Sequence, residues 1–122
     1  MQLKRVVVTG MGALTPIGNN LEAYWEGLRT GKSGCAPITY FDTEKFKTKF
    51  ACELKGYDPN DFFDRKEVRK LDRFAQYALV SSDEAIADSG IDLDHVDKFR
   101  VGVIWGAGIG GLETFQNEVI GY

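Results

Sequence analysis

The sequence predicts an α/β fold in which helical segments separate parallel strands. Two short apolar runs rich in β-branched residues, Leu3–Val8 and Val101–Trp105, have the composition of buried strands. A glycine-containing turn follows each run, and helical patterns occupy much of the sequence between them. Strands that alternate with helices pair in parallel, because the helix carries the chain back across the sheet.

The first third of the chain predicts a turn and a helix after the first strand. Thr9–Gly12 turns the chain out of the strand, and Pro16 in the following loop has no N–H to offer a phosphate, so we predict no nucleotide site there. Asn19 with Glu22 three residues later forms a capping pair, and Gly31 closes the helix. One helical face is apolar and consists of Leu21, Tyr24, Trp25 and Leu28.

A long connection without a sustained helical period follows, over residues 32–57. Phe50–Leu54 has the composition of a short strand within it. We expect the aromatic side chains of this connection, rather than binding a ligand, to pack it onto the body of the protein: Tyr40, Phe41, Phe46 and Phe50. Asp58 followed by Pro59 then predicts a single turn that ends near Phe63.

The longest predicted helix is Arg65–Ser89. Asp64 and Glu67 form the capping pair at its start, and Gly90 terminates it. Its buried stripe consists of Val68, Leu71, Ala75, Ala78, Leu79, Ala85 and Ile86.

The first two turns of this helix carry the one concentrated positive patch of the chain. The cations are Arg65, Lys66, Arg69, Lys70 and Arg73, and the arginines, spaced at i, i+4 and i+8, share a face. Each cation near a helix N-terminus costs about 0.3–1 kcal/mol against the macrodipole when no partner relieves it. The residues alone leave two interpretations open, a solvated face or a site for an anionic partner.

A second glycine cluster follows the second apolar run: Gly106, Gly108, Gly110 and Gly111. Leu112, Phe115 and Val119 come next at helical spacing, which predicts a strand, a glycine turn and a helix. The cluster contains the spacing G-x-G-x-x-G of dinucleotide-binding loops. Three interpretations stay open: a structural turn, a backbone that approaches an acyl or similar substrate, and a dinucleotide site.

Composition limits the class of protein. The chain has 122 residues, 43% of them hydrophobic, and a net charge of −3, which favours one domain and argues against a general nucleic-acid or membrane-surface binder. Because no apolar run approaches the roughly 18 residues of a membrane span, we expect a cytoplasmic protein. Cys35 and Cys52 predict reduced thiols. The acidic turn around His95 lacks calcium-loop spacing, and we predict no metal site.

The predicted elements do not make a closed body. Two or three strands with helices between them leave sheet edges and apolar strand faces uncovered, and such a unit is marginal alone. We therefore expect the N-terminal piece of a longer protein, or a chain that is ordered only against other chains.

Five motifs in order along the chain resemble the β-ketoacyl-acyl-carrier-protein synthases, and most of all the type II elongation enzymes of bacterial fatty-acid synthesis. They are VVVTGMGALTPIGN at residues 6–19, RTGKSG at 29–34, FDTEKFKTKFA at 41–51, DRKEVRKLDRFAQYA at 64–78 and GAGIGGLETF at 106–115. The resemblance covers essentially the whole of this chain. It covers only about the first third of a complete family member.

This resemblance implies a thiolase-like fold, layered αβαβα with a mixed sheet, in which residues 1–122 form part of the N-terminal domain of a homodimeric enzyme. The implied reaction is a decarboxylative Claisen condensation between an acyl thioester on a cysteine and malonyl carrier protein. The family's catalytic cysteine and histidines would lie beyond residue 122. We therefore predict no catalytic residue in this chain, an inactive fragment, and no cofactor, since substrates are carried on the phosphopantetheine of the carrier protein.

Two features can be carried over by position. Lys66, Arg69 and Lys70 match the basic helix with which the family meets the acidic acyl carrier protein. Gly108 and Ile109 match the point where the acyl tunnel is gated, so Ile109 would touch the growing chain. Two rival functions remain: a non-catalytic subunit of the chain-length-factor type, which shares the fold, and a dinucleotide-dependent reductase, which rests on the glycine spacing alone.

Overall fold

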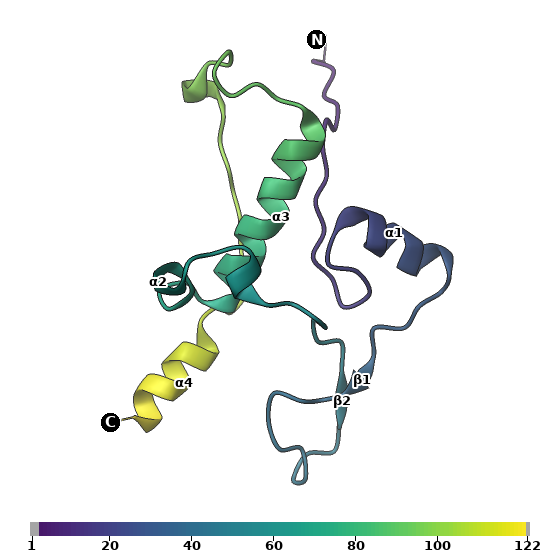
Figure 1. Ribbon diagram of the computed structural model, residues 1–122, viewed down its shortest axis with the longest axis vertical. Coiled ribbons are helices and arrows are strands. Elements are labelled where there is room, and N and C mark those ends of the chain that lie inside the picture. The colour runs from purple at the N-terminus through teal and green to yellow at the C-terminus, as the bar shows by residue number, and fades with distance from the viewer. Residues whose placement is uncertain (1–2, 122) are drawn as a thin grey trace.

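The structure, a computed structural model, describes residues 3–121 and is mostly helical with one small sheet (Figure 1). In chain order its elements are α1 (Leu21–Arg29), β1 (Ala36–Pro37), β2 (Phe50–Ala51), the 3₁₀ turn η1 (Pro59–Asp61), α2 (Arg65–Val68), α3 (Arg73–Ser89), the 3₁₀ turn η2 (Lys98–Arg100) and α4 (Leu112–Ile120). The long helix α3 lies in the middle of the molecule, and the β1–β2 hairpin and α4 extend away from it (Figure 1).

The predicted parallel sheet is wrong for this chain. Leu3–Val8 and Val101–Trp105 run as irregular, extended segments, and the antiparallel pair β1–β2 is the only sheet within residues 3–121. Their apolar side chains face solvent, since Val6 is 89% exposed and Ile104 is 99% exposed. A strand needs a neighbour for its ladder of hydrogen bonds and a layer over its apolar face, and the described part of the chain supplies neither.

Helix α1 confirms the predicted helix and corrects its cap. The N-cap is Asn20, whose side chain accepts a hydrogen bond from the Ala23 N–H at 2.8 Å. Asn19, the predicted cap, instead donates from Nδ2 to the Lys55 carbonyl oxygen at 2.8 Å. Both residues are asparagine, so the cap was assigned one residue too early, and Gly31 follows the helix with a φ of +66° as expected.

The single helix predicted over Arg65–Ser89 is two helices, α2 and α3. The chain is extended at Asp72, with φ −60° and ψ 153°, and Asp72 is the N-cap of α3. The break frees the Leu71 carbonyl oxygen, which accepts a hydrogen bond from Nε2 of Gln76 at 2.9 Å. Gln76 is only 4% exposed, so its buried side-chain amide supplies the hydrogen bond that the Leu71 carbonyl oxygen loses at the break between the helices.

The remaining predicted caps and turns are confirmed, whereas the predicted buried stripe of the long helix is wrong at Leu79, which is 43% exposed, and at Ile86, which is 39% exposed. Asp64 and Glu67 form the capping box of α2, Asp58 caps η1, and Gly90 ends α3 with a φ of +62°. The aromatic residues of the long connection are an exception, because Tyr40, Phe41, Phe46 and Phe50 are all more than half exposed. Phe41 and Phe46 contact each other edge to face, while the Tyr40 ring lies beneath the Arg73 guanidinium.

Carboxylates of α3 hold the first loop and α1. Glu84 accepts hydrogen bonds from the backbone N–H groups of Ala13 at 2.8 Å and Leu21 at 2.7 Å. Asp88 accepts one from the Met11 N–H at 2.9 Å. Polar contacts therefore fix this part of the chain without a large apolar core.

Within residues 3–121, Val80 and Gln76 are the only buried side chains. The solvent-accessible surface is 10566 Å², whereas a compact monomer of 13.6 kDa would have about 6,600 Å². The exposed surface includes large apolar side chains of both extended segments and of α4. These exposed apolar surfaces are of the kind that further protein would bury.

Candidate functional site

The basic patch is carried by the short helix α2 and the turn after it. Arg65, Lys66, Arg69 and Lys70 are all exposed, and within residues 3–121 no carboxylate lies within 4.0 Å of their charged nitrogens. The Asp64 carboxylate caps the N-terminus of α2. It accepts hydrogen bonds from two free backbone N–H groups of the first turn, that of Lys66 at 2.7 Å and that of Glu67 at 2.9 Å. The four cations are therefore available to an anionic partner.

Arg73 is not part of this patch, which corrects the predicted i, i+4, i+8 row of arginines. The break before α3 removes the helical register between Arg69 and Arg73. Arg73 instead forms an ion pair with Glu113 at 3.2 Å, and its guanidinium lies 4.7 Å from the centre of the Tyr40 ring. Although burial opposes its charge, the Glu113 carboxylate and the nearby tyrosines raise the pKa of Arg73, so it stays protonated.

The second glycine cluster is anchored at its end and open at its middle. A methyl group added at Gly110 would lie 2.6 Å from the Phe74 ring. Gly111 has a φ of +73°, and a methyl group there would lie 3.0 Å from the Asp72 carboxylate. At Gly108, by contrast, an added methyl group meets no atom within 4 Å, and the neighbouring Ile109 is 77% exposed.

One side-chain hydrogen bond ties the start of α4 to the start of α3. The Thr114 hydroxyl donates to the Asp72 carboxylate, although 42 residues separate the two in sequence. Together with the Arg73–Glu113 ion pair, it fixes the glycine cluster against the junction between α2 and α3. Sequence reasoning missed this pair, because the two residues lie in separate motifs and no local spacing relates Asp72 to Thr114.

One cavity of about 290 Å³ lies where α2, α3 and the glycine cluster meet. Its lining includes Val68 of α2, Phe74 of α3 and Ile109 of the glycine cluster. Figure 1 shows α2 and α4 at the same end of α3. Of the predicted site residues, Ile109 lines this cavity, whereas Gly108 and the cations of the basic patch do not.

The lining of the cavity includes neither a cysteine nor a histidine. Cys35 and Cys52 lie at the β1–β2 hairpin, as exposed free thiols, and His95 forms a 2.6 Å contact with Asp92 in an exposed turn. None of these three residues lines the cavity. Residues 101–105, directly before the glycines, form no strand, so the dinucleotide interpretation lacks the strand–turn–helix context that it requires. In the same described range, no helix has the length and apolar character needed to cross a bilayer.

The sequence of this chain matches a known protein family. The profile described as beta-ketoacyl synthase, N-terminal domain, matches residues 3–120. The chain belongs to the β-ketoacyl synthase family. This membership confirms the resemblance inferred from the five sequence motifs.

Similar proteins include enzymes named 3-oxoacyl-[acyl-carrier-protein] synthase 2. The chain is 48% identical over 115 residues to 3-oxoacyl-[acyl-carrier-protein] synthase 2 of Staphylococcus aureus, an alignment that covers 94% of this chain. It is 43% identical over 118 residues, 97% of its length, to the enzyme of the same name from Synechocystis. In both cases the chain spans 28% of the relative's length.

Solved structures place the fold in the same family. An ishigamide ketosynthase/chain length factor structure is 39% identical and superposes with a TM-score of 0.65, over 72% of this chain and 22% of that one. A ketosynthase in complex with its type II polyketide acyl-carrier protein is 26% identical with a TM-score of 0.56, over 79% of this chain and 25% of that one. The described residues therefore form part of a ketosynthase, thiolase-like fold.

Proposed function

We propose that this chain is the carrier-docking and acyl-contacting part of a 3-oxoacyl-[acyl-carrier-protein] synthase. The complete enzyme would elongate fatty acyl chains by decarboxylative Claisen condensation of an acyl thioester with malonyl carrier protein. One observation carries the proposal: in a member of the β-ketoacyl synthase family, α2 and the turn after it carry four exposed cations without an ion-pair partner in the described chain, and Val68 of α2 lines the same cavity as Ile109.

The docking surface consists of Lys66, Arg69 and Lys70, with Arg65 beside them. An acidic carrier protein would be attracted to this surface over about 8–10 Å at ordinary ionic strength, which raises the rate of encounter. The capping box keeps α2 formed despite its unpaired cations, so the charges are held on a short rigid element. A related ketosynthase has been solved with its acyl-carrier protein bound, which supports this kind of partner.

The acyl contact consists of Gly108 and Ile109. Because Gly108 has open space where a side chain would project, another molecule can approach the backbone there. The exposed Ile109 side chain offers an apolar surface of the kind that an acyl chain covers, and its burial by substrate would be favourable.

The condensation chemistry would come from residues outside this chain. A cysteine thiolate would take the acyl group, and histidines would assist decarboxylation and stabilise charge on the thioester oxygen. We accordingly propose that residues 1–122 are inactive alone and form part of the N-terminal domain of a homodimeric, cytoplasmic enzyme with a layered mixed sheet. The large apolar surface of the described chain supports a larger folded body.

Charge reversal tests the docking surface. In the complete enzyme, Lys66→Glu with Arg69→Glu should weaken binding of acyl carrier protein about tenfold at low salt, roughly 1.4 kcal/mol, and flatten its salt dependence. The measurement is a titration of carrier protein at several ionic strengths.

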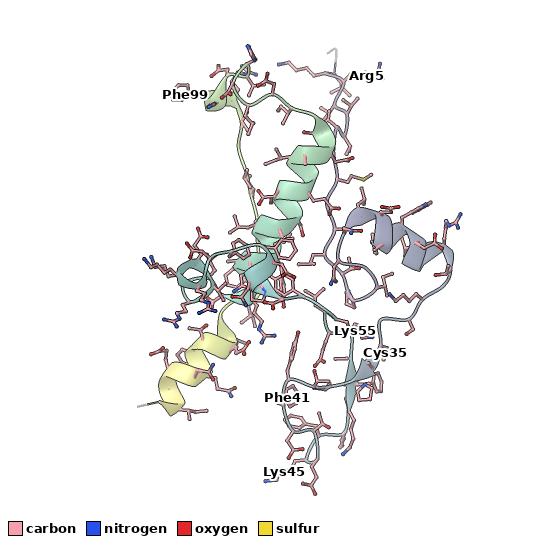
Figure 2. All side chains as sticks on the ribbon, in the orientation of Figure 1. Arg5, Cys35, Phe41, Lys45, Lys55 and Phe99 are labelled. Atoms are coloured by element: carbon pink, nitrogen blue, oxygen red, sulfur yellow. The ribbon has the colours of Figure 1, made fainter. Side chains whose placement is uncertain are left out.

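The matched control is Lys45→Glu with Lys47→Glu, which changes the net charge equally at the outer end of the β1–β2 hairpin (Figure 2). This control should keep near-native affinity. If both double variants lose the same affinity, the effect is one of net charge and the assignment of α2 as the docking element is wrong.

The similarity to a ketosynthase/chain length factor structure keeps one second candidate, a non-catalytic subunit of the chain-length-factor type. Such a subunit would retain the fold and the partner surface but lack the nucleophile. The residue at the family's cysteine position in the complete gene distinguishes the two: cysteine supports the synthase, and any other residue supports the non-catalytic subunit.

A further inference from the structure

The chain's two cysteines directly flank the paired residues of the β1–β2 hairpin. The strands are antiparallel, with Ala36 opposite Ala51 and Pro37 opposite Phe50. Extending this register by one residue pairs Cys35 with Cys52. Both thiols are free and exposed. Figure 2 shows Cys35 at the base of the hairpin, whose loop carries Phe41 and Lys45.

The hydrogen-bond pattern identifies the type of cross-strand position that the cysteines occupy. The Ile38 N–H donates to the Lys49 carbonyl oxygen at 3.1 Å, so Ile38 and Lys49 form a hydrogen-bonded position. The next position contains Pro37, which has no N–H and therefore suits a non-hydrogen-bonded site. Since the two types alternate along an antiparallel pair, Ala36 is at a bonded site and Cys35 is opposite Cys52 at a non-bonded one.

Non-hydrogen-bonded positions bring side chains closest. Opposite Cα atoms there are about 4.5 Å apart, which falls within the range of roughly 4.4–6.8 Å that a disulfide spans. The two cysteines also share a face, because Cys35, Pro37, Phe50 and Cys52 are exposed while the alternating Ala36 and Ala51 are partly covered. The two sulfur atoms therefore project from the same side of the hairpin.

Side-chain contacts also join the two segments that contain the cysteines. The Glu53 carboxylate, directly after Cys52, accepts from the Thr39 N–H at 3.0 Å and from its hydroxyl at 2.8 Å. The Lys55 ammonium donates to the carbonyl oxygen of Gly34, directly before Cys35, at 2.9 Å. Both contacts hold the segment after β2 against the chain on either side of β1.

We propose that Cys35 and Cys52 are a reversible thiol-modification site that closes to a disulfide when a low-molecular-weight disulfide oxidises it. One cysteine thiolate attacks the oxidant, forms a mixed disulfide and releases one small thiol. The second cysteine thiolate then attacks the protein sulfur of that mixed disulfide and releases the second small thiol. The two protein thiols lose two protons and two electrons, the oxidant is reduced to two thiols, and the hairpin loop between the cysteines is closed.

Glutathione disulfide is the probe for the test, applied to the complete protein that contains this chain. After alkylation of free thiols and non-reducing tryptic digestion, peptide 33–45 (SGCAPITYFDTEK) should be linked to peptide 50–55 (FACELK), two hydrogens lighter than the sum. Dithiothreitol should release both peptides. The proposal is overturned if both cysteines stay free, or if oxidation stops at the mixed disulfide with glutathione.

A control variant tests whether disulfide formation depends on the cross-strand position of the two cysteines or only on their spacing in sequence. The double variant Ala51→Cys with Cys52→Ala keeps two cysteines at nearly the same spacing but moves one thiol to the opposite face of the hairpin. We expect its intramolecular disulfide to form at least tenfold more slowly than that of the native protein. Equal rates would overturn the assignment, and the native protein's ratio of linked to glutathionylated peptide tests the proposal even if this variant does not fold.

Discussion

The two glycine-rich stretches of the chain, Thr9–Gly18 and Gly106–Gly111, look alike in sequence and differ in what surrounds them. A methyl group added at Gly12 would lie 2.0 Å from the Ser81 carbonyl oxygen of α3, whereas one added at Gly108 would meet nothing within 4 Å. The first stretch uses glycine to let backbone pack on a helix. In the second stretch, the space beside the central glycine remains free for a molecule other than this chain.

The two glycine-rich stretches have different surroundings because side-chain hydrogen bonds hold them at different places. Carboxylates of Glu84 and Asp88 bind the first stretch along the side of α3. Within residues 3–121, the side-chain bonds that hold the second stretch come directly after it, where Thr114 donates to Asp72 and Glu113 pairs with Arg73. A glycine cluster anchored at one end leaves its preceding residues exposed, which is the arrangement that a substrate-facing loop needs.

The largest expected effect comes from Gly12→Ala. Because its methyl group would overlap the Ser81 carbonyl oxygen, α3 and the first loop must separate, at a cost of about 1–3 kcal/mol. The midpoint of urea unfolding of the complete protein measures this loss. Gly108→Ala is the paired control and should change stability by less than about 0.5 kcal/mol. Equal losses in both variants would show that the two stretches are packed alike in the whole enzyme.

A smaller loss is expected for Gly111→Ala. The residue has a φ of +73°, a conformation that costs a residue with a side chain about 1–2 kcal/mol, and its methyl group would also press on the Asp72 carboxylate. Asparagine tolerates this backbone region better than alanine, so Gly111→Asn separates the two causes. If the asparagine variant is the more stable, the backbone is the main cause; if both variants unfold like the native protein, Gly111 is not an anchor.

Sequence reasoning succeeded where a signal lies within a few residues. The capping box of Asp64 and Glu67, the end of α3 at Gly90 and the helix after the second glycine cluster are encoded by short spacings and were predicted. The asparagine cap of α1 was off by one because adjacent asparagines carry the same local signal. The family resemblance drew on several such segments at once and was therefore reliable.

The misplaced features depend on residues that are distant in sequence. The break between α2 and α3 is stabilised by Gln76 and by the Asp72–Thr114 bond, neither of which a helical period reveals. The apolar runs predicted as strands have no strand partner within residues 3–121. The hydrophobic pattern of a segment does not show whether a second strand is present to pair with it. In the same way, the pairing of Cys35 with Cys52 depends on hairpin register, which cysteine spacing does not specify.

The smallest effect on stability, and the most direct test of the open stretch, is expected from Ile109→Phe. Since this side chain is 77% exposed in the chain, enlarging it should shift unfolding of the complete enzyme by no more than about 0.5 kcal/mol. If Ile109 contacts the acyl chain, the larger ring fills space that long substrates need and shortens the products. Mass spectrometry of the acyl products measures this shift, and Ile109→Leu, of equal volume, is the control. An unchanged product profile in a stable Ile109→Phe enzyme would remove Ile109 from the acyl path, while leaving the docking role of α2 untouched.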